Sequence, residues 1–152
     1  MVQLGQKAEN FTLPAVGGES ISLSDYKGKK LVIYFYPKDM TPGCTQQACD
    51  FRDSESYFNA KNAAVIGISA DDVKSHEKFG AKYELPFPLL SDTEHTVSEQ
   101  FGVWQIKKNF GKEYEGIVRS TFLLDEEGTL IREWRKVKVA GHVDEVLQAL
   151  ES

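Results

Sequence analysis

The sequence predicts an α/β fold in which a mixed sheet lies between flanking layers of helices. Two runs, residues 31–36 (LVIYFY) and 64–69 (AVIGIS), are continuously apolar, which is typical of strands covered on both faces. Segments with helical spacing of apolar residues follow both runs, and this alternation favours parallel strands joined through helices. The 152-residue chain contains no internal repeat or linker-like stretch, so a single domain over residues 1–152 is expected.

An N-terminal β-hairpin is expected before the first buried strand. In residues 11–13 and again in residues 21–23, two apolar side chains are separated by one other residue. Gly17-Gly18 lies between these two segments. Alternation on both sides of a glycine turn is typical of a hairpin with one buried face. A turn at residues 24–28 then leads into the strand at 31–36.

A helix over residues 45–62 is expected after a loop at residues 37–43. Its apolar side chains fall on one face at roughly 100° per residue, and they are Cys44, Ala48, Phe51 and Phe58. A second helix is expected over residues 71–84. It ends before Pro86, because proline cannot continue a helix.

The remaining elements complete a recognisable order. They are a strand at 87–90, a helix at 93–101, a strand at 117–125, its hairpin partner at 129–139 and a closing helix at 143–150. This order resembles a thioredoxin-like fold, in which a buried strand leads through a loop to a cysteine at the start of a helix. The resemblance implies a three-layer sandwich with a mixed central sheet.

Charge and hydropathy exclude two function classes. The chain has 18 basic and 23 acidic residues, a net charge of −5, whereas nucleic-acid-binding modules carry a basic excess. The apolar runs are only a few residues long, which excludes a membrane-spanning helix. Residues 1–10 lack the apolar central stretch of a signal peptide, so a cytoplasmic location is expected.

Cys44 follows Thr41-Pro42-Gly43, where the helix after the buried strand is expected to begin. The first backbone N–H groups of a helix have no intrahelical partner, and the macrodipole presents about half a positive charge there. Both effects favour the thiolate, which is the nucleophilic form of cysteine. The alternative is that Cys44 is a small buried apolar residue, which would gain nothing from this placement.

Cys49 is the other cysteine, and its distance along the helix restricts bonding to Cys44. Two cysteines are too few for a disulfide scaffold, and this spacing does not suit a zinc site. On a helix the two side chains point about 140° apart, with Cα atoms roughly 8–9 Å apart. An unstrained disulfide needs a Cα separation below about 7 Å. A transient bridge, formed when the first helical turn unwinds, therefore fits better than a structural one.

Residues 37–44 (PKDMTPGC) resemble the active-site signature of the peroxiredoxins, P-x-x-x-T-P-G-C. The position of Cys49 is similar to that of the resolving cysteine in the bacterioferritin comigratory protein subfamily, also called the Q-type or atypical 2-Cys peroxiredoxins. Further stretches that resemble this subfamily are residues 23–29, 101–104, 116–122 and 141–143. The resemblance covers nearly the whole chain.

The resemblance implies a thiol-dependent peroxidase in which a hydroperoxide oxidises Cys44 to a sulfenic acid. Thr41 would place its hydroxyl between the thiolate and the peroxide, accepting from one oxygen and donating toward sulfur. Pro37 would shield the site. Arg119 would stabilise the thiolate and the charge on the leaving oxygen. Arg119 lies in an apolar run, so its charge needs an anionic partner; a surface ion pair with a nearby glutamate is the alternative.

The resemblance assigns Cys49 the resolving role, in which it condenses with the sulfenic acid to form a Cys44–Cys49 disulfide. Thioredoxin or a similar dithiol would reduce this bond, and no cofactor or metal is implied. An intramolecular resolving cysteine favours a monomer. Gln47 departs from many relatives, which carry glutamate there. A non-enzymatic redox sensor and a general thiol–disulfide oxidoreductase remain alternatives, although the latter chemistry favours C-x-x-C.

Other polar residues carry less information. His76, His95 and His142 show no metal-ligand spacing, so exposed or capping positions are expected. A basic stretch in the last hairpin is expected to be a solvated face, with docking of an acidic reductase as the alternative; its members are Arg132, Arg135, Lys136 and Lys138.

Overall fold

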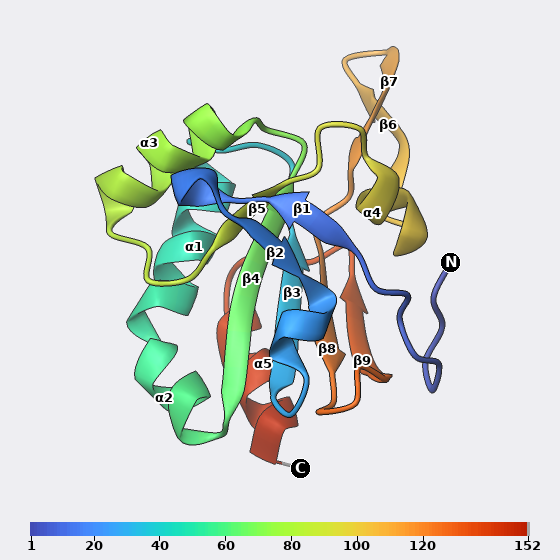
Figure 1. Cartoon of the computed structure of the whole chain (residues 1–152). Helices are drawn as coiled ribbons and strands as arrows, with labels where there is room; N and C mark the ends of the chain where they lie inside the picture. The colour runs from blue at the N-terminus through green and yellow to red at the C-terminus, as the bar shows by residue number, and fades with distance from the viewer. Residues whose placement is uncertain (152) are drawn as a thin grey trace.

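A computed structural model, which describes residues 1–151, places a five-stranded mixed sheet at the centre of the chain (Figure 1). The strands are β1 (Thr12–Pro14), β2 (Ser20–Ser22), β3 (Lys30–Phe35), β4 (Ala63–Ser69), β5 (Leu89–Ser91), β6 (Trp104–Asn109), β7 (Lys112–Ile117), β8 (Ser120–Leu124) and β9 (Leu130–Arg135). The helices are α1 (Pro42–Asp53), α2 (Glu55–Ala60), α3 (Val73–Tyr83), α4 (Thr96–Gln100) and α5 (His142–Glu151). Within residues 1–151, none of the helices is long and apolar enough to cross a membrane.

The central sheet has the order β5-β4-β3-β8-β9. β3 runs parallel to β4, with Val32 opposite Val65, and antiparallel to β8, with Val32 opposite Leu123. β8 and β9 form an antiparallel hairpin at the edge of the sheet. The predicted mixed sheet is therefore confirmed, and its central strand, β3, leads directly into the loop at residues 37–41.

Side chains along β3 alternate between two cores, one on each face of the sheet. The odd-numbered residues from Leu31 to Phe35 pack with the N-terminal hairpin and α4. The even-numbered residues from Val32 to Tyr36 pack with α1 and α5. In Figure 1, β1 and β2 cross in front of the sheet, whereas α1, α2 and α5 lie behind it. The predicted three-layer arrangement and the N-terminal hairpin are confirmed, with Leu13 opposite Ile21 in the hairpin.

The single helix predicted over residues 45–62 is wrong, because the chain forms two helices there. α1 begins at Pro42, whose fixed φ suits the first helical position. Ser54 (φ −104°, ψ 6°) ends α1, and α2 starts at Glu55. Phe51 and Phe58 are both buried on the same side of the sheet. The helical spacing of apolar residues therefore continues across Ser54, and the sequence gives no sign of the break.

The single strand predicted over residues 117–125 is also wrong. β7 ends at Ile117 and β8 begins at Ser120, so Arg119 lies in a two-residue connection. β7 pairs with β6 in an antiparallel ribbon that extends from the body of the fold (Figure 1). Most side chains of β6 and of the first half of β7 are exposed. The alternation that indicates a strand is therefore absent there, and the sequence reasoning missed the ribbon.

The other predicted elements are present with shifted ends. The largest shift is at the last strand, which was expected to reach residue 139 but ends at Arg135. The next residue, Lys136, has a φ of 53°. A left-handed residue turns the chain out of the strand conformation, and the chain then proceeds to α5.

Candidate active site

Cys44 is the third residue of α1 and is only 1% exposed. Thr41 is the N-cap residue, but its side chain makes no capping hydrogen bond, and the first turn of α1 carries no acidic side chain. The unpaired N–H groups and positive dipole end of α1 therefore lie close to the sulfur without a competing carboxylate in that turn. Both favour a negative charge on Cys44.

Arg119 reaches Cys44 from the connection between β7 and β8. Its Nη2 atom lies 3.3 Å from Cys44 Sγ and donates to the sulfur. Gly43 leaves room for this approach, because a Cβ atom at that position would lie 3.2 Å from Nη2 and the guanidinium would have to shift slightly. Arg119 therefore contacts the sulfur and Gln47, which disfavours the alternative of a surface ion pair with a glutamate.

Gln47, one turn after Cys44, holds the other side of the guanidinium. Its Oε1 atom accepts from Arg119 Nη1 at 2.6 Å, and the side chain is fully buried. Its Nε2 atom has no hydrogen-bond partner among the described residues. Gln47 therefore orients Arg119 without neutralising it, so the cation remains free to act on the sulfur.

Thr41 and Pro37 lie in the loop that precedes α1. The Thr41 hydroxyl donates to the carbonyl oxygen of Lys38 at 2.9 Å, so in this arrangement its proton is not donated to the sulfur, as the resemblance had implied. Its oxygen lone pairs remain able to accept a hydrogen bond. Pro37 is half-buried and directly follows the buried Tyr36.

Lys107 is a second cation near the site that the sequence reasoning missed. It comes from β6, and its Nζ atom donates to the carbonyl oxygen of Ile117 at 3.0 Å. Burial and the positive charge of Arg119 lower the pKa of Lys107, whereas the sulfur of Cys44 acts in the opposite direction. Only recognition of the β6–β7 ribbon could have revealed this residue.

Cys49 lies on the same helix as Cys44 and is partly exposed. Both cysteines are free thiols. Cys44 packs in the core with Ala48 and Phe51, between β3 and α5. The structure is therefore the dithiol form of the pair.

Comparison with known proteins places these residues in a family. Residues 4–133 match the AhpC/TSA family. Peroxiredoxin Bcp of Bacillus subtilis is 59% identical over 150 residues, which cover 99% of this chain and 96% of the relative. The chain belongs to the AhpC/TSA family of peroxiredoxins. The resemblance inferred from residues 37–44 is thereby confirmed.

Solved structures agree with this assignment. Peroxiredoxin Q of Xanthomonas campestris superposes with a TM-score of 0.89 at 48% identity, covering 93% of this chain and 89% of the other. A PrxQ structure from Xylella fastidiosa superposes with a TM-score of 0.95 at 39% identity, covering 99% and 96%. The fold of this peroxiredoxin is therefore the thioredoxin-like fold that the sequence predicted.

The expectation that the histidines are exposed or capping is wrong for two of them. His76 is fully buried and His142 is 2% exposed. His142 Nε2 lies 2.8 Å from Thr121 Oγ1, and its ring meets Phe51 and Trp134 edge to face. His95 is the N-cap residue of α4 and stacks on Trp104, with ring centroids 4.1 Å apart.

His142 predicts an acid-sensitive stability for this peroxiredoxin. Burial, aided by the charge of Arg119, lowers its pKa from 6.5 to about 4. Between these pH values the unfolded chain binds a proton that the native protein does not, so the free energy of unfolding falls as the pH falls. The full shift sets an upper limit, and we expect a loss of about 2 kcal/mol from this group.

Denaturant unfolding at pH 7 and pH 4.5 checks this expectation. Carboxylates also titrate in this range, so the informative quantity is the difference between wild type and His142→Asn, which should lose less stability on acidification. Equal losses in wild type and His142→Asn would contradict the prediction.

Proposed function

We propose that this peroxiredoxin reduces hydrogen peroxide and organic hydroperoxides in a cycle that uses Cys44 and Cys49. The observation that carries the proposal is the buried Cys44 sulfur at the start of α1, with Arg119 Nη2 at 3.3 Å. A thiolate in this position is stabilised by a fixed cation and by the helix end. The same cation can bind the negative charge that develops on a leaving oxygen.

In the first step, the Cys44 thiolate attacks one oxygen of the hydroperoxide and the O–O bond breaks. Sulfur is oxidised to a sulfenic acid, and the other oxygen takes up a proton and leaves as an alcohol or water. Arg119 stabilises this leaving oxygen, and Gln47 keeps the guanidinium in place. The Thr41 oxygen is available to accept a hydrogen bond from the hydroperoxide, and Pro37 covers the loop side of the site.

In the second step, the Cys49 thiolate attacks the sulfenic sulfur, the disulfide forms as the S–O bond breaks, and the oxygen takes up a proton and leaves as water. Both cysteines lie on α1, and five helical residues hold their Cα atoms roughly 8–9 Å apart. Bond formation therefore requires the start of α1 to unwind. A dithiol of the thioredoxin type then reduces the bond by thiol–disulfide exchange, and the helix re-forms.

Support for organic substrates comes from a relative. A solved structure, 47% identical, concerns the alkyl peroxide reduction activity of the bacterioferritin comigratory protein of Xanthomonas campestris. We extend this substrate class to the present chain. We also propose that the enzyme works as a monomer in the cytoplasm, because both cysteines of the cycle belong to one chain and a reducing compartment supports repeated reduction of the bond.

Mass spectrometry of the non-reduced protein after one equivalent of hydrogen peroxide tests the proposal. We expect a Cys44–Cys49 disulfide, formed after rapid loss of peroxide in a stopped-flow measurement. Slow loss of peroxide would instead favour the redox sensor or the general oxidoreductase. A product without this bond would refute the assigned resolving step.

Cys49→Ser separates the two chemical steps. We expect the variant to consume one equivalent of peroxide at the wild-type rate, because Cys44 and Arg119 are unchanged. It should then stop with Cys44 as a sulfenic acid and fail to turn over with thioredoxin. Steady-state turnover of this variant at the wild-type rate would contradict the role of Cys49.

A further inference from the structure

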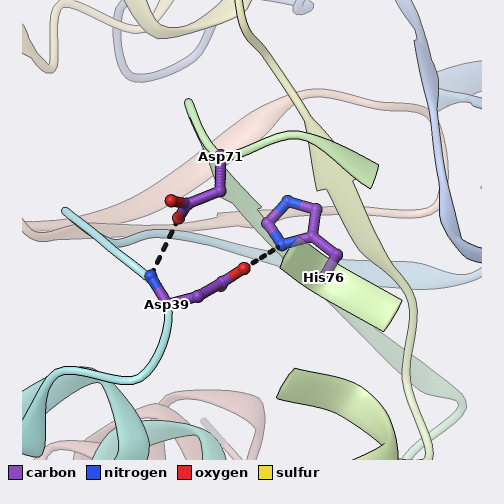
Figure 2. A group of neighbouring side chains, drawn as sticks. All are labelled: Asp39, Asp71 and His76. Atoms are coloured by element: carbon purple, nitrogen blue, oxygen red, sulfur yellow. Dashed lines mark hydrogen bonds and ion pairs between the residues drawn. The ribbon is translucent and has the colours of Figure 1, made fainter. Parts of the chain in front are cut away.

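A buried hydrogen-bond network attaches the catalytic loop to α3. Asp39, five residues before Cys44, is 4% exposed. Its Oδ1 atom accepts from Tyr36 Oη at 2.6 Å, and its Oδ2 atom accepts from Ser75 Oγ and His76 Nδ1, each at 2.7 Å. Figure 2 shows Asp39 between His76 and Asp71. One carboxylate thus joins the loop to the first turn of α3.

His76 is the central contact of this attachment on the side of α3. His76 Nε2 faces the carbonyl oxygen of Leu90 at 3.0 Å, while Nδ1 faces the Asp39 carboxylate. The carboxylate can only accept, so Nδ1 is the donor of this contact, and Tyr36 Oη also lies 3.4 Å from Nδ1. Burial alone would raise the pKa of Asp39, but the hydrogen bonds from His76 and Tyr36 and the charge of His76 outweigh it and lower that pKa.

Asp71 extends the network to the end of β4. Its Oδ2 atom accepts from the backbone N–H of Asp39 at 2.8 Å and from Ser69 Oγ at 2.7 Å (Figure 2). Asp39, Asp71 and His76 offer ligand atoms within 4.8 Å of one another, a spacing that also suits a metal ion. Both Asp39 oxygens already accept from donors, however, so the geometry is that of a hydrogen-bonded anchor.

A second contact attaches the far end of α1 to the same helix. Arg52, three residues after Cys49, donates through Nη1 to the carbonyl oxygen of Tyr83 at 2.8 Å. Tyr83 is the last residue of α3, whereas Ser75 and His76 lie in its first turn. Hydrogen bonds to a charged donor are stronger than neutral ones, and a helix C-terminus favours a cation. Asp39 and Arg52 therefore bind opposite ends of α3.

We propose that α3 acts as a brace that confines the redox-driven unwinding to residues 40–51, with Asp39 and Arg52 as positioning residues. The proposal rests on the Cys44–Cys49 cycle proposed above. Residues 40–51 contain both cysteines and span about 40 Å when extended, whereas α3 is about 16 Å long. The segment between the anchors therefore has enough slack to form the disulfide while both anchors stay in place.

The brace also affects how the site re-forms after reduction. With Asp39 and Arg52 held, the chain ends of the unwound segment stay close to their native positions. The conformational entropy lost when α1 refolds is then smaller than for a segment with a free end. Cys44 then returns to its position beside Arg119 without rearrangement of the rest of the fold.

Amide hydrogen exchange, read by mass spectrometry in the reduced and the peroxide-oxidised protein, tests the brace. On oxidation of the wild type we expect at least about tenfold faster exchange within residues 40–51, and less than about threefold change at Asp39 and across residues 75–83. Loss of protection that spreads equally through residues 75–83 would overturn the proposal.

Variants of the anchors sharpen the test. In Asp39→Asn and Arg52→Gln, measured without denaturant, we expect the oxidised state to lose protection beyond residues 40–51 by at least about tenfold and the reduced state by less than about threefold. A purely structural role would change the reduced and oxidised states alike. Arg52→Lys keeps a cationic donor, so the loss of protection on oxidation should again be confined mostly to residues 40–51. Arg132→Gln removes a surface arginine that lies over Trp134 and should match wild type.

The same experiment distinguishes failure of the brace from failure of the proposed function. The non-reduced peptide mass reports whether the Cys44–Cys49 bond has formed. Without that bond the proposed cycle fails, and the brace is still tested in the reduced protein at low denaturant concentration. There, rare openings of residues 40–51 should stop at Asp39 and Arg52 in the wild type and extend past them in the variants. A boundary elsewhere, or one that the variants leave unchanged, would overturn the brace.

Discussion

Cys44→Ser is expected to reduce peroxide consumption to the rate measured without protein, a loss of at least about 10³-fold. A serine hydroxyl fits the space of the thiol, so the variant should keep its fold. It does not provide the ionised, highly nucleophilic sulfur that the start of α1 and Arg119 stabilise. Stopped-flow measurement of peroxide loss, with protein in stoichiometric amount, gives the rate.

Cys49→Ser is the matched control for Cys44→Ser. It makes the same chemical change five residues away on the same helix and should leave the first turnover intact. Circular dichroism of both variants checks that the fold is retained. Rapid, stoichiometric peroxide loss by Cys44→Ser would remove Cys44 from the reaction and leave no peroxidatic cysteine in this site.

Arg119→Ala is expected to slow the attack on peroxide by about 10²- to 10³-fold, the usual effect of removing one preorganised donor from a developing charge. Two losses combine in this variant. The attacking sulfur loses the donor at 3.3 Å. The leaving oxygen also loses the cation that stabilises its developing charge.

The rate of peroxide loss, measured across a range of pH, gives the size of the combined loss. Arg119→Lys keeps the charge but cannot bind the sulfur and Gln47 together through one planar group, so we expect an intermediate rate. Arg132→Ala, at a surface arginine, should match wild type across the pH range. An unchanged rate of peroxide loss in Arg119→Ala would contradict this role and favour the alternative that Arg119 forms only a surface ion pair.

The central fold was predictable because its signals are local and strong. Residues 31–36 and 64–69 are apolar on both faces, and only a covered sheet accommodates such runs. The break at Ser54 was not predictable, because Phe51 and Phe58 keep helical spacing across it. The β6–β7 ribbon was not predicted for the opposite reason. Most of its side chains are exposed, so its sequence shows no alternation of apolar and polar residues.

The candidate site was predictable only in part. The position of Cys44 in residues 37–44 and the need of Arg119 for an anionic partner were visible in the sequence. The pairing of Asp39 with His76 was not, because it joins residues 37 positions apart through a buried network. Lys107 was not predicted either, because it lies in the β6–β7 ribbon. Contacts of this kind form only when the layers of the fold pack together, so the local spacing of residues in the sequence does not indicate them.

The loosely held first turn of α1 has a consequence for survival under excess peroxide. A sulfenic acid has two fates: capture by Cys49, or a second oxidation to sulfinic acid, which thiols do not reverse. A side-chain cap is typically worth about 1 kcal/mol, and glycine in a helix costs about as much. Thr41 makes no such cap and Gly43 lies in that turn. We therefore expect the turn to open quickly enough for capture to outcompete over-oxidation, so that the enzyme tolerates peroxide doses that would inactivate a version with a firmer helix start.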